Sequence, residues 1–335
     1  MYRLSYGRID GLFEKINSVC ALYLPVNKAY VKYESGVKFD EKELNTVRSA
    51  KDFFFPQVEN IARFKMQGKK IEILENKDEN EPFAVFGVRA CDARSFELLD
   101  RVFLSDPADP YYKNRREKGI VITTACNEPE ESCFCTAFGI DPAEPKGDIS
   151  TWVADGFVYW QSNTEKGEEL TLKLADIFEE CDSTSIDKIK SNINTIAEKL
   201  PLASLNLSYW KNKSEKEIFA NEKWGEIYKG CLGCGTCTFV CPTCQCYDVK
   251  DFDCGTAVQK FRCWDSCMYS DFTLMAHGNP RKTQKERFRQ RFMHKLKYFP
   301  ANNGGEFSCV GCGRCVRSCP QSLNIVKVIR SVHDD

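Results

Sequence analysis

The sequence has no long apolar segment, no export signal and no excess of one charge. No apolar run approaches the roughly 18–20 residues that a membrane-spanning helix needs. The first residues lack the basic start, apolar run and small-residue cleavage site of a signal peptide. Lys and Arg number 47 against 48 Asp and Glu, a balance that gives no reason to expect a nucleic-acid partner. We therefore expect a cytoplasmic chain that binds neither membranes nor nucleic acids.

The motifs of several common enzyme classes are also missing. There is no G-x-G-x-x-G after a strand, no P-loop, no H-E-x-x-H and no G-x-S-x-G elbow. The three histidines, His277, His294 and His333, stand at no recognised ligand spacing, so we assign them no chemistry. The sequence thus offers no nucleotide site, no hydrolytic nucleophile and no substrate pocket.

Cysteine, in contrast, is abundant, with 19 residues. In a reducing cytosol this number indicates metal ligation rather than disulfides. One pattern occurs twice: Cys231-x2-Cys234-x2-Cys237-x3-Cys241-Pro242 recurs as Cys309-x2-Cys312-x2-Cys315-x3-Cys319-Pro320. Such a run holds iron–sulfur clusters, and in two-cluster ferredoxins the fourth cysteine ligates the other cluster. The pattern predicts one 4Fe–4S cluster on Cys231, Cys234, Cys237 and Cys319, and another on Cys309, Cys312, Cys315 and Cys241.

The residues between these cysteines suit a cluster. Glycines at 233, 235, 311 and 313 lack a Cβ and let the backbone approach closely. Pro242 and Pro320 turn the chain away without an N–H to satisfy. A zinc knuckle would need four ligands per run with a wider gap between two cysteine pairs. The paired runs therefore favour iron–sulfur clusters over zinc or disulfides, and iron is the only metal that we expect.

The first two thirds of the chain show an α/β pattern. Lys70–Leu74, Phe83–Val88 and Gly119–Thr124 are strand-like, and Asp92–Leu104 has helical spacing with Asp92 as N-cap. A strand–helix–strand unit implies a parallel pair. We predict an α/β domain over residues 1–215. We predict a mostly helical, two-cluster ferredoxin-like (α+β) domain over 216–335, with a long insert at about 243–308.

Four cysteines of the α/β half are candidates for a further site. Cys91 and Cys126 fall just past the C-terminal ends of two predicted parallel strands, where open α/β sheets bind ligands. Cys133 and Cys135 follow closely enough to join them. From the residues alone, a third 4Fe–4S cluster, a zinc tetrad and a group of buried thiols are equally good interpretations.

The segment between the two runs carries five more cysteines and a basic stretch. The cysteines have no regular spacing, so we expect them to pack around the clusters: Cys244, Cys246, Cys254, Cys263 and Cys267. Over Arg281–Lys297, Phe288, Phe292 and Leu296 recur at helical spacing. We expect an amphipathic helix whose basic face is solvated. The alternative is a docking surface for an acidic partner or for flavin phosphates.

These motifs, taken together, resemble one family. They are Gly87-Val-Arg-Ala-Cys91-Asp92, Asp109-Pro-Tyr-Tyr112, Cys126, Cys133-Phe-Cys135, Cys241-Pro-Thr-Cys244-x-Cys246, Trp264-Asp-Ser-Cys267 and Asn279-Pro-Arg281. The chain resembles the family of iron–sulfur subunits that anaerobic sulfite reductase shares with soluble NiFe sulfhydrogenase, whose beta subunit belongs to it. The resemblance extends from about residue 83 to 320.

The resemblance implies an electron-transfer subunit of a multisubunit oxidoreductase. Its partners would be a flavin subunit that reacts with NAD(P)H and carries FAD, and a terminal reductase or hydrogenase. The family's cysteines match at Cys91, Cys126, Cys133 and Cys135, which favours a third 4Fe–4S cluster there. Because oxygen attacks exposed clusters, we also expect an anaerobic host. No residue is assigned a catalytic role. The alternative is a catalytic subunit with its substrate site at an N-terminal metal centre.

The remaining cysteines divide under the same resemblance. Cys244, Cys246 and Cys267 match cysteines of the family, whereas Cys254 and Cys263 do not. The resemblance leaves open whether the three that match bind metal.

Overall fold

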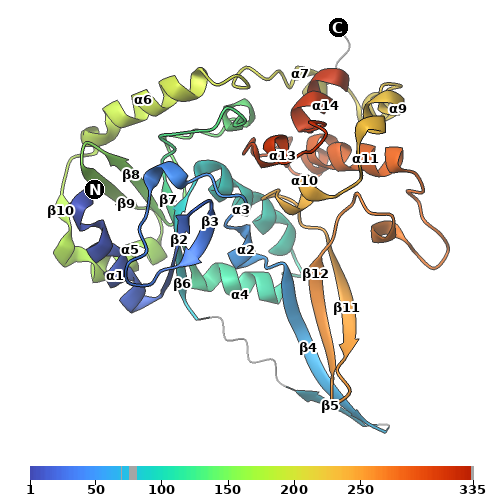
Figure 1. The fold of residues 1–335 in the computed structure, drawn as a ribbon, viewed down its shortest axis with the longest axis horizontal. Helices are drawn as coiled ribbons and strands as arrows, with labels where there is room; N and C mark the ends of the chain where they lie inside the picture. The colour runs from blue at the N-terminus through green and yellow to red at the C-terminus, as the bar shows by residue number, and fades with distance from the viewer. Residues whose placement is uncertain (69, 75–80, 333–335) are drawn as a thin grey trace.

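The computed structural model describes residues 1–68, 70–74 and 81–332, which form one large and one small β-sheet with helices around them (Figure 1). His333 lies outside the described residues. The strands are β1 (Tyr2–Ser5), β2 (Ala21–Val26), β3 (Ala29–Lys32), β4 (Val58–Gln67), β5 (Lys70–Leu74), β6 (Phe83–Val88), β7 (Gly119–Thr124), β8 (Ile149–Ala154), β9 (Phe157–Ser162), β10 (Glu179–Glu180), β11 (Tyr247–Asp253) and β12 (Val258–Trp264). The predicted mixed α/β content is confirmed, and the three predicted strands are present as β5, β6 and β7.

The large sheet has the strand order β10-β1-β9-β8-β7-β6-β2-β3. Its centre is parallel, because β7 pairs in parallel with both β6 and β8, and β6 with β2. The outer strands are antiparallel. Every residue of β6 is buried, as expected for a parallel strand whose two faces are both covered.

Helices cover both faces of this sheet. The helices are α1 (Ile9–Val19), α2 (Lys51–Phe54), α3 (Ala90–Phe103), α4 (Pro110–Lys118), α5 (Glu165–Lys173), α6 (Asp187–Glu198), α7 (Ser208–Asn212), α8 (Glu215–Ala220), α9 (Trp224–Ile227), α10 (Thr236–Phe239), α11 (Gln284–Met293), α12 (Phe299–Asn302), α13 (Arg314–Arg317) and α14 (Ile325–Val332). Side chains of α1 and α5 pack with Phe86 and Ile122, whereas α2, α3 and α4 pack with Val85 and Val121. Successive strand residues point to opposite faces, so these two cores lie on the two sides of the sheet.

The predicted helix over Asp92–Leu104 is α3, which starts two residues earlier. The prediction that Asp92 is its N-cap is wrong, because Arg89 occupies that position. Asp92 lies in the first turn instead, where it is fully buried and paired with Arg314. Because a buried carboxylate needs a cationic partner, its side chain serves this ion pair rather than the end of the helix.

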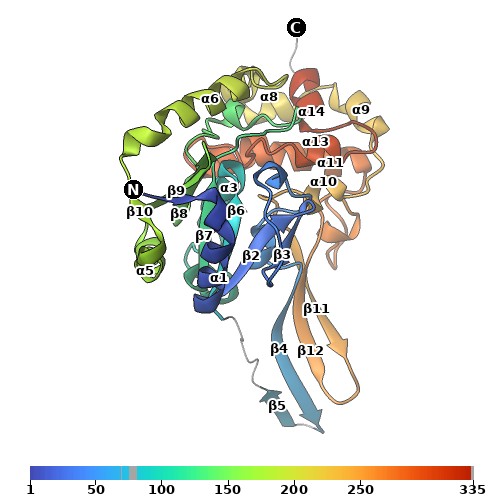
Figure 2. The ribbon, with the colours of Figure 1, turned by 60° about the vertical axis from the view of Figure 1, so that its left-hand side comes forward.

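The small sheet, in the order β11-β12-β4-β5, projects from the body as an antiparallel arm (Figures 1 and 2). Strands β11 and β12 come from the segment between the two cysteine runs, and β12 pairs with β4 of the N-terminal part. Buried Arg262 reinforces this junction by donating to Glu59 at 2.7 Å and to Asp109. The predicted division at residues 215 and 216 is therefore crossed by a continuous sheet.

The C-terminal part contains the short helices α7–α14 around a separate core. Trp210, Trp224, Phe288, Phe292 and Ile329 are among its buried residues. Phe134, from the loop that follows β7, also belongs to this core. Across the described residues, no helix is long and apolar enough to cross a membrane.

Candidate metal centres

The first set of thiols, defined as Cys231, Cys234, Cys237 and Cys319, lines one cavity. Cys231 and Cys234 precede the short helix α10, Cys237 lies on it, and Cys319 follows α13. Helices α10 and α13 contact each other, which brings the end of the second run to the first run. The apolar side chains of Met268, Phe288, Phe292 and Leu323 complete the cavity wall.

The second set, defined as Cys309, Cys312, Cys315 and Cys241, lies next to the first. Burial raises the pKa of Cys315 to about 12, and the neighbouring thiols of Cys312, Cys241 and Cys237 add to this rise. Cys237 belongs to the first set, so the two sets lie within electrostatic reach of each other. The structure thus brings together the crosswise groups of four that the sequence predicts.

The N-terminal set, defined as Cys91, Cys126, Cys133 and Cys135, lines another cavity, and Cys312 of the second set lies in the same wall. Cys91 is in the first turn of α3 and Cys126 follows β7, so both lie at the C-terminal edge of parallel strands as predicted. Burial raises the pKa of Cys126 to about 11 and that of Cys135 to about 12. Such thiols stay protonated at neutral pH unless a metal displaces the proton.

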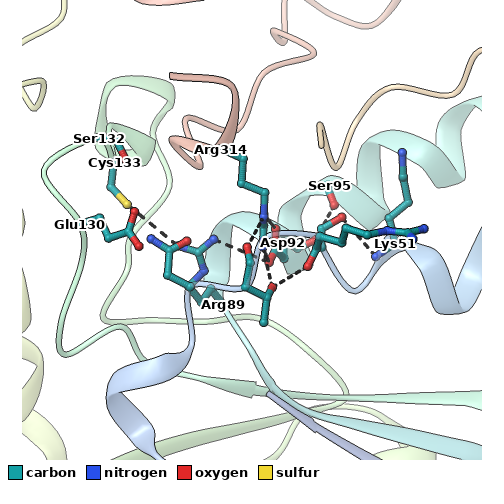
Figure 3. A network of polar contacts seen from close by, with 12 residues as sticks. Lys51, Arg89, Asp92, Ser95, Glu130, Ser132, Cys133 and Arg314 are labelled. Atoms are coloured by element: carbon teal, nitrogen blue, oxygen red, sulfur yellow. Dashed lines mark hydrogen bonds and ion pairs between the residues drawn. The ribbon is translucent and has the colours of Figure 1, made fainter. Parts of the chain in front are cut away.

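Arg89 is a functional candidate in this cavity that the sequence reasoning missed. Its side chain is 2% exposed, and its Nη1 lies 4.0 Å from the Cys133 sulfur (Figure 3). Its Nη2 is 3.9 Å from Asp92, beyond hydrogen-bond reach. Neither Nε nor Nη2 has a hydrogen-bond partner among the described residues. A buried guanidinium with free donors indicates a place for an anion.

A buried ion pair joins the second run to the α/β half. Arg314 lies between Cys312 and Cys315, and both of its terminal nitrogens bond to the Asp92 carboxylate, one of them at 2.7 Å (Figure 3). Its Nε also donates to the carbonyl oxygen of Thr46 at 2.9 Å. Burial alone would raise the pKa of Asp92, but the Arg314 guanidinium holds it below its usual range.

Two glycines of the second run are required by close packing against the N-terminal half. The Phe134 N–H donates to the Gly311 carbonyl at 2.9 Å. Gly311 and Gly313 have φ of +59° and +76°, and a Cβ on Gly313 would lie 2.6 Å from the Ser132 Oγ. A Cβ on Gly311 would collide with the Phe134 carbonyl. At these positions glycine serves contact with the 132–135 loop, a reason beyond the cluster approach that the sequence suggests.

The five cysteines of the segment between the runs separate into two groups. Cys244 and Cys267 are enclosed, and contact with the Cys267 thiol lowers the pKa of Cys246. Lys51, buried under Trp264, donates to the carbonyl oxygens of Cys241 and Cys244 at 3.0 and 2.9 Å. Cys254, by contrast, is exposed on the β11–β12 hairpin, and Cys263 lies on β12.

The basic stretch forms α11 and a π-helical turn over His294–Tyr298, and its basic face is not wholly solvated. Arg291 and Lys295 are buried. Together with Phe288 and Phe292 they occupy positions i, i+3, i+4 and i+7, the spacing of one helix face. The expectation of a solvated basic face is wrong for these two residues. The spacing itself contained the information that they lie on the apolar side.

The donor groups fit iron–sulfur clusters better than single ions. All three sets consist of four thiols, the ligands of 4Fe–4S clusters. Within residues 1–68, 70–74 and 81–332, no three His, Cys, Asp or Glu side chains are close enough to hold one metal ion. A zinc tetrad would bring its four ligands within about 2.0–2.3 Å of one centre. Free guanidinium donors beside the sets suit an anionic group larger than zinc.

Comparison with known proteins first defines the class of this chain. Residues 230–323 match the family model of the 4Fe–4S dicluster domain. Over nearly its whole length, the chain is similar to sulfhydrogenase 2 subunit beta of Pyrococcus furiosus. The two are 35% identical over 96% of this chain and 95% of that protein. The chain therefore belongs to the iron–sulfur subunit family that includes the sulfhydrogenase beta subunits. No solved structure matches it.

Proposed function

We propose that this chain is a non-catalytic electron-transfer subunit of a multisubunit cytoplasmic oxidoreductase. The observation that carries the proposal is the crosswise grouping of the two cysteine runs. Cys319, from the end of the second run, lines the same cavity as Cys231, Cys234 and Cys237 of the first. This partition is the one that two-cluster ferredoxins use, and the match to a 4Fe–4S dicluster domain supports it.

The three thiol sets would hold three 4Fe–4S clusters, two of them in a helical ferredoxin-like domain after residue 216. When bound, such clusters accept and release single electrons. The chain's own residues supply the ligands, the apolar walls and the buried cations. Burial of the second set excludes water and limits charge build-up.

The sets lie in a row. Cys312 of the second set lines the cavity of the N-terminal set, and Cys315 of the second set interacts with Cys237 of the first. The second set is therefore the middle one. Cys234 of the first set is exposed, and neighbouring Leu232 is 63% exposed. The first set would therefore exchange electrons with a partner at the surface.

The partners that we propose are a flavin subunit that reacts with NAD(P)H and binds FAD, and a terminal reductase or hydrogenase. The relative in Pyrococcus furiosus is one subunit of a sulfhydrogenase, which supports a hydrogenase as the terminal partner. A catalytic role at the N-terminal set has less support. A neighbouring cysteine set, rather than substrate-binding groups, forms part of that cavity's wall.

Iron and acid-labile sulfide analysis of anaerobically purified protein tests this proposal. Three clusters correspond to about twelve irons per chain and two to about eight. A Cys135→Ser variant should lose about four irons and keep the EPR signals of the two ferredoxin-type clusters. Protein that contains zinc and no sulfide would contradict the proposal.

A further inference from the structure

One buried cation lies where the first and second sets meet. Arg291 is 2% exposed and lines the cavity of the first set. Its Nη2 donates to the carbonyl oxygen of Cys237 at 2.9 Å. Its Nε and Nη1 are buried, and in the described part of the chain neither has a hydrogen-bond partner. Two of the three guanidinium nitrogens are thus left without an acceptor.

Arg291 cannot relieve this situation by losing its proton. An arginine side chain stays charged in proteins, and an unpaired buried charge is strongly unfavourable. Burial alone would lower the pKa of Arg291, but the thiolates around it, first Cys237 and then Cys315, keep that pKa well above its usual range. Cys237 belongs to the first set and Cys315 to the second. The positive charge therefore acts on both sets.

Lys295, one turn further along, is a useful contrast. It is also buried, but its Nζ donates to Thr243 Oγ1 at 2.7 Å and to the Ser308 carbonyl at 3.1 Å. These partners stand beside the two cysteine runs, so Lys295 links the runs through ordinary hydrogen bonds. Arg291 differs because it keeps unused donors in the region between the two sets.

We propose that Arg291 is the shared counter-charge and hydrogen-bond donor of the two ferredoxin-type clusters and raises the reduction potential of both. The inference rests on the proposed function, because it requires clusters in both sets. Cluster potentials depend on net charge and on hydrogen bonds to sulfur. Each electron accepted adds negative charge, so a fixed positive charge with free N–H donors favours the reduced state. No proton accompanies the electron, because the guanidinium is already fully protonated.

An EPR-monitored redox titration of the full-length, anaerobically purified protein, with dithionite as reductant, tests this. In Arg291→Gln we expect unchanged iron content and a shift of both ferredoxin-type clusters to more negative potentials. Arg291→Lys keeps the charge but loses the planar donors, so its shift should be smaller. Arg289→Gln is the matched control. It removes the same charge from the same helix, where Arg289 lies over the Phe219 ring, and should leave both potentials unchanged.

A measurement on the unaltered sequence makes the test independent of variant folding. Protein labelled with nitrogen-15 arginine should show, by pulsed EPR, coupling between a guanidinium nitrogen and the reduced ferredoxin-type clusters, and Arg291→Lys should lack it. Equal potentials in the wild type and Arg291→Gln at equal iron content would overturn the proposal, as would the absence of coupling. If Arg291→Gln loses iron, the coupling in the wild type decides. Protein without iron and sulfide would instead overturn the proposed function.

Discussion

Buried cations face each of the thiol sets. Arg89 lines the N-terminal cavity, Arg291 lines the cavity of the first set, and Lys295 interacts with the thiols of the second. Burying such charges in the absence of an anion is costly. Cluster binding and folding should therefore be coupled, as in other proteins where a metal site forms only in the folded state.

Loss of one ligand should show this coupling. Cys234→Ala should remove about four irons per chain and lower the melting temperature, because the first set organises α10 and the end of α13. The matched control is Cys254→Ala, a cysteine exposed on the β11–β12 hairpin. Anaerobic melting curves and iron analysis give the comparison. Equal iron and equal melting temperatures in the two variants would contradict the ligand assignment.

The Asp92–Arg314 pair makes a separate prediction. Asp92→Ala leaves the Arg314 charge buried and unpaired, so it should destabilise the protein by about 3–5 kcal/mol in anaerobic urea unfolding. Asp92→Leu combined with Arg314→Leu should recover part of this loss. A double-mutant coupling energy near zero would contradict the pair's role.

The pH dependence of this pair follows from the lowered pKa of Asp92. A carboxyl whose pKa is lower in the folded than in the unfolded state contributes stability above the unfolded pKa, about 3.9. That contribution is lost only as the pH falls through the folded pKa. The coupling energy should therefore be the same at pH 6 and pH 8.

Among the structural elements, the 132–135 loop and the 311–313 loop form the contact between the N-terminal and second sets. Gly313→Ala should weaken this contact, because the new Cβ would lie 2.6 Å from the Ser132 Oγ. Gly304→Ala is the control, since Gly304 also has positive φ but nothing within 4 Å of an added Cβ. Backbone strain costs about 1–3 kcal/mol in either variant, so Gly313→Ala should be the less stable. Equal unfolding free energies would show that the loops tolerate separation.

The elements that local pattern specifies were predicted from the sequence. Strands β6 and β7 and their parallel pairing follow from continuous apolar runs around an amphipathic helix. The pairing of β12 with β4 was not predictable, because its partners are far apart in the chain and β11 is exposed throughout. Asp92 was misread as a cap because its partner, Arg314, is equally distant in sequence. The cysteine groups were predictable because spacing alone defines them.

At the scale of the whole molecule, the two halves are interlocked by the β12–β4 junction and by the Asp92–Arg314 pair. The fragment 216–335, expressed alone, should therefore hold less iron than the same residues in the full chain. Co-expression with the fragment 1–215 should restore it. Iron analysis of both preparations is the measurement. A lone fragment with about eight irons and full stability would show that the predicted domain boundary also separates independent folding units.

The crosswise grouping also has a consequence for biogenesis. Cys231, Cys234 and Cys237 leave the ribosome well before Cys319, their companion in the same cavity. Cys241 must likewise wait for the run that begins at Cys309. Neither ferredoxin-type centre can be completed on a partly synthesised chain, so the cellular machinery that delivers iron and sulfide must act after translation has passed the second repeat.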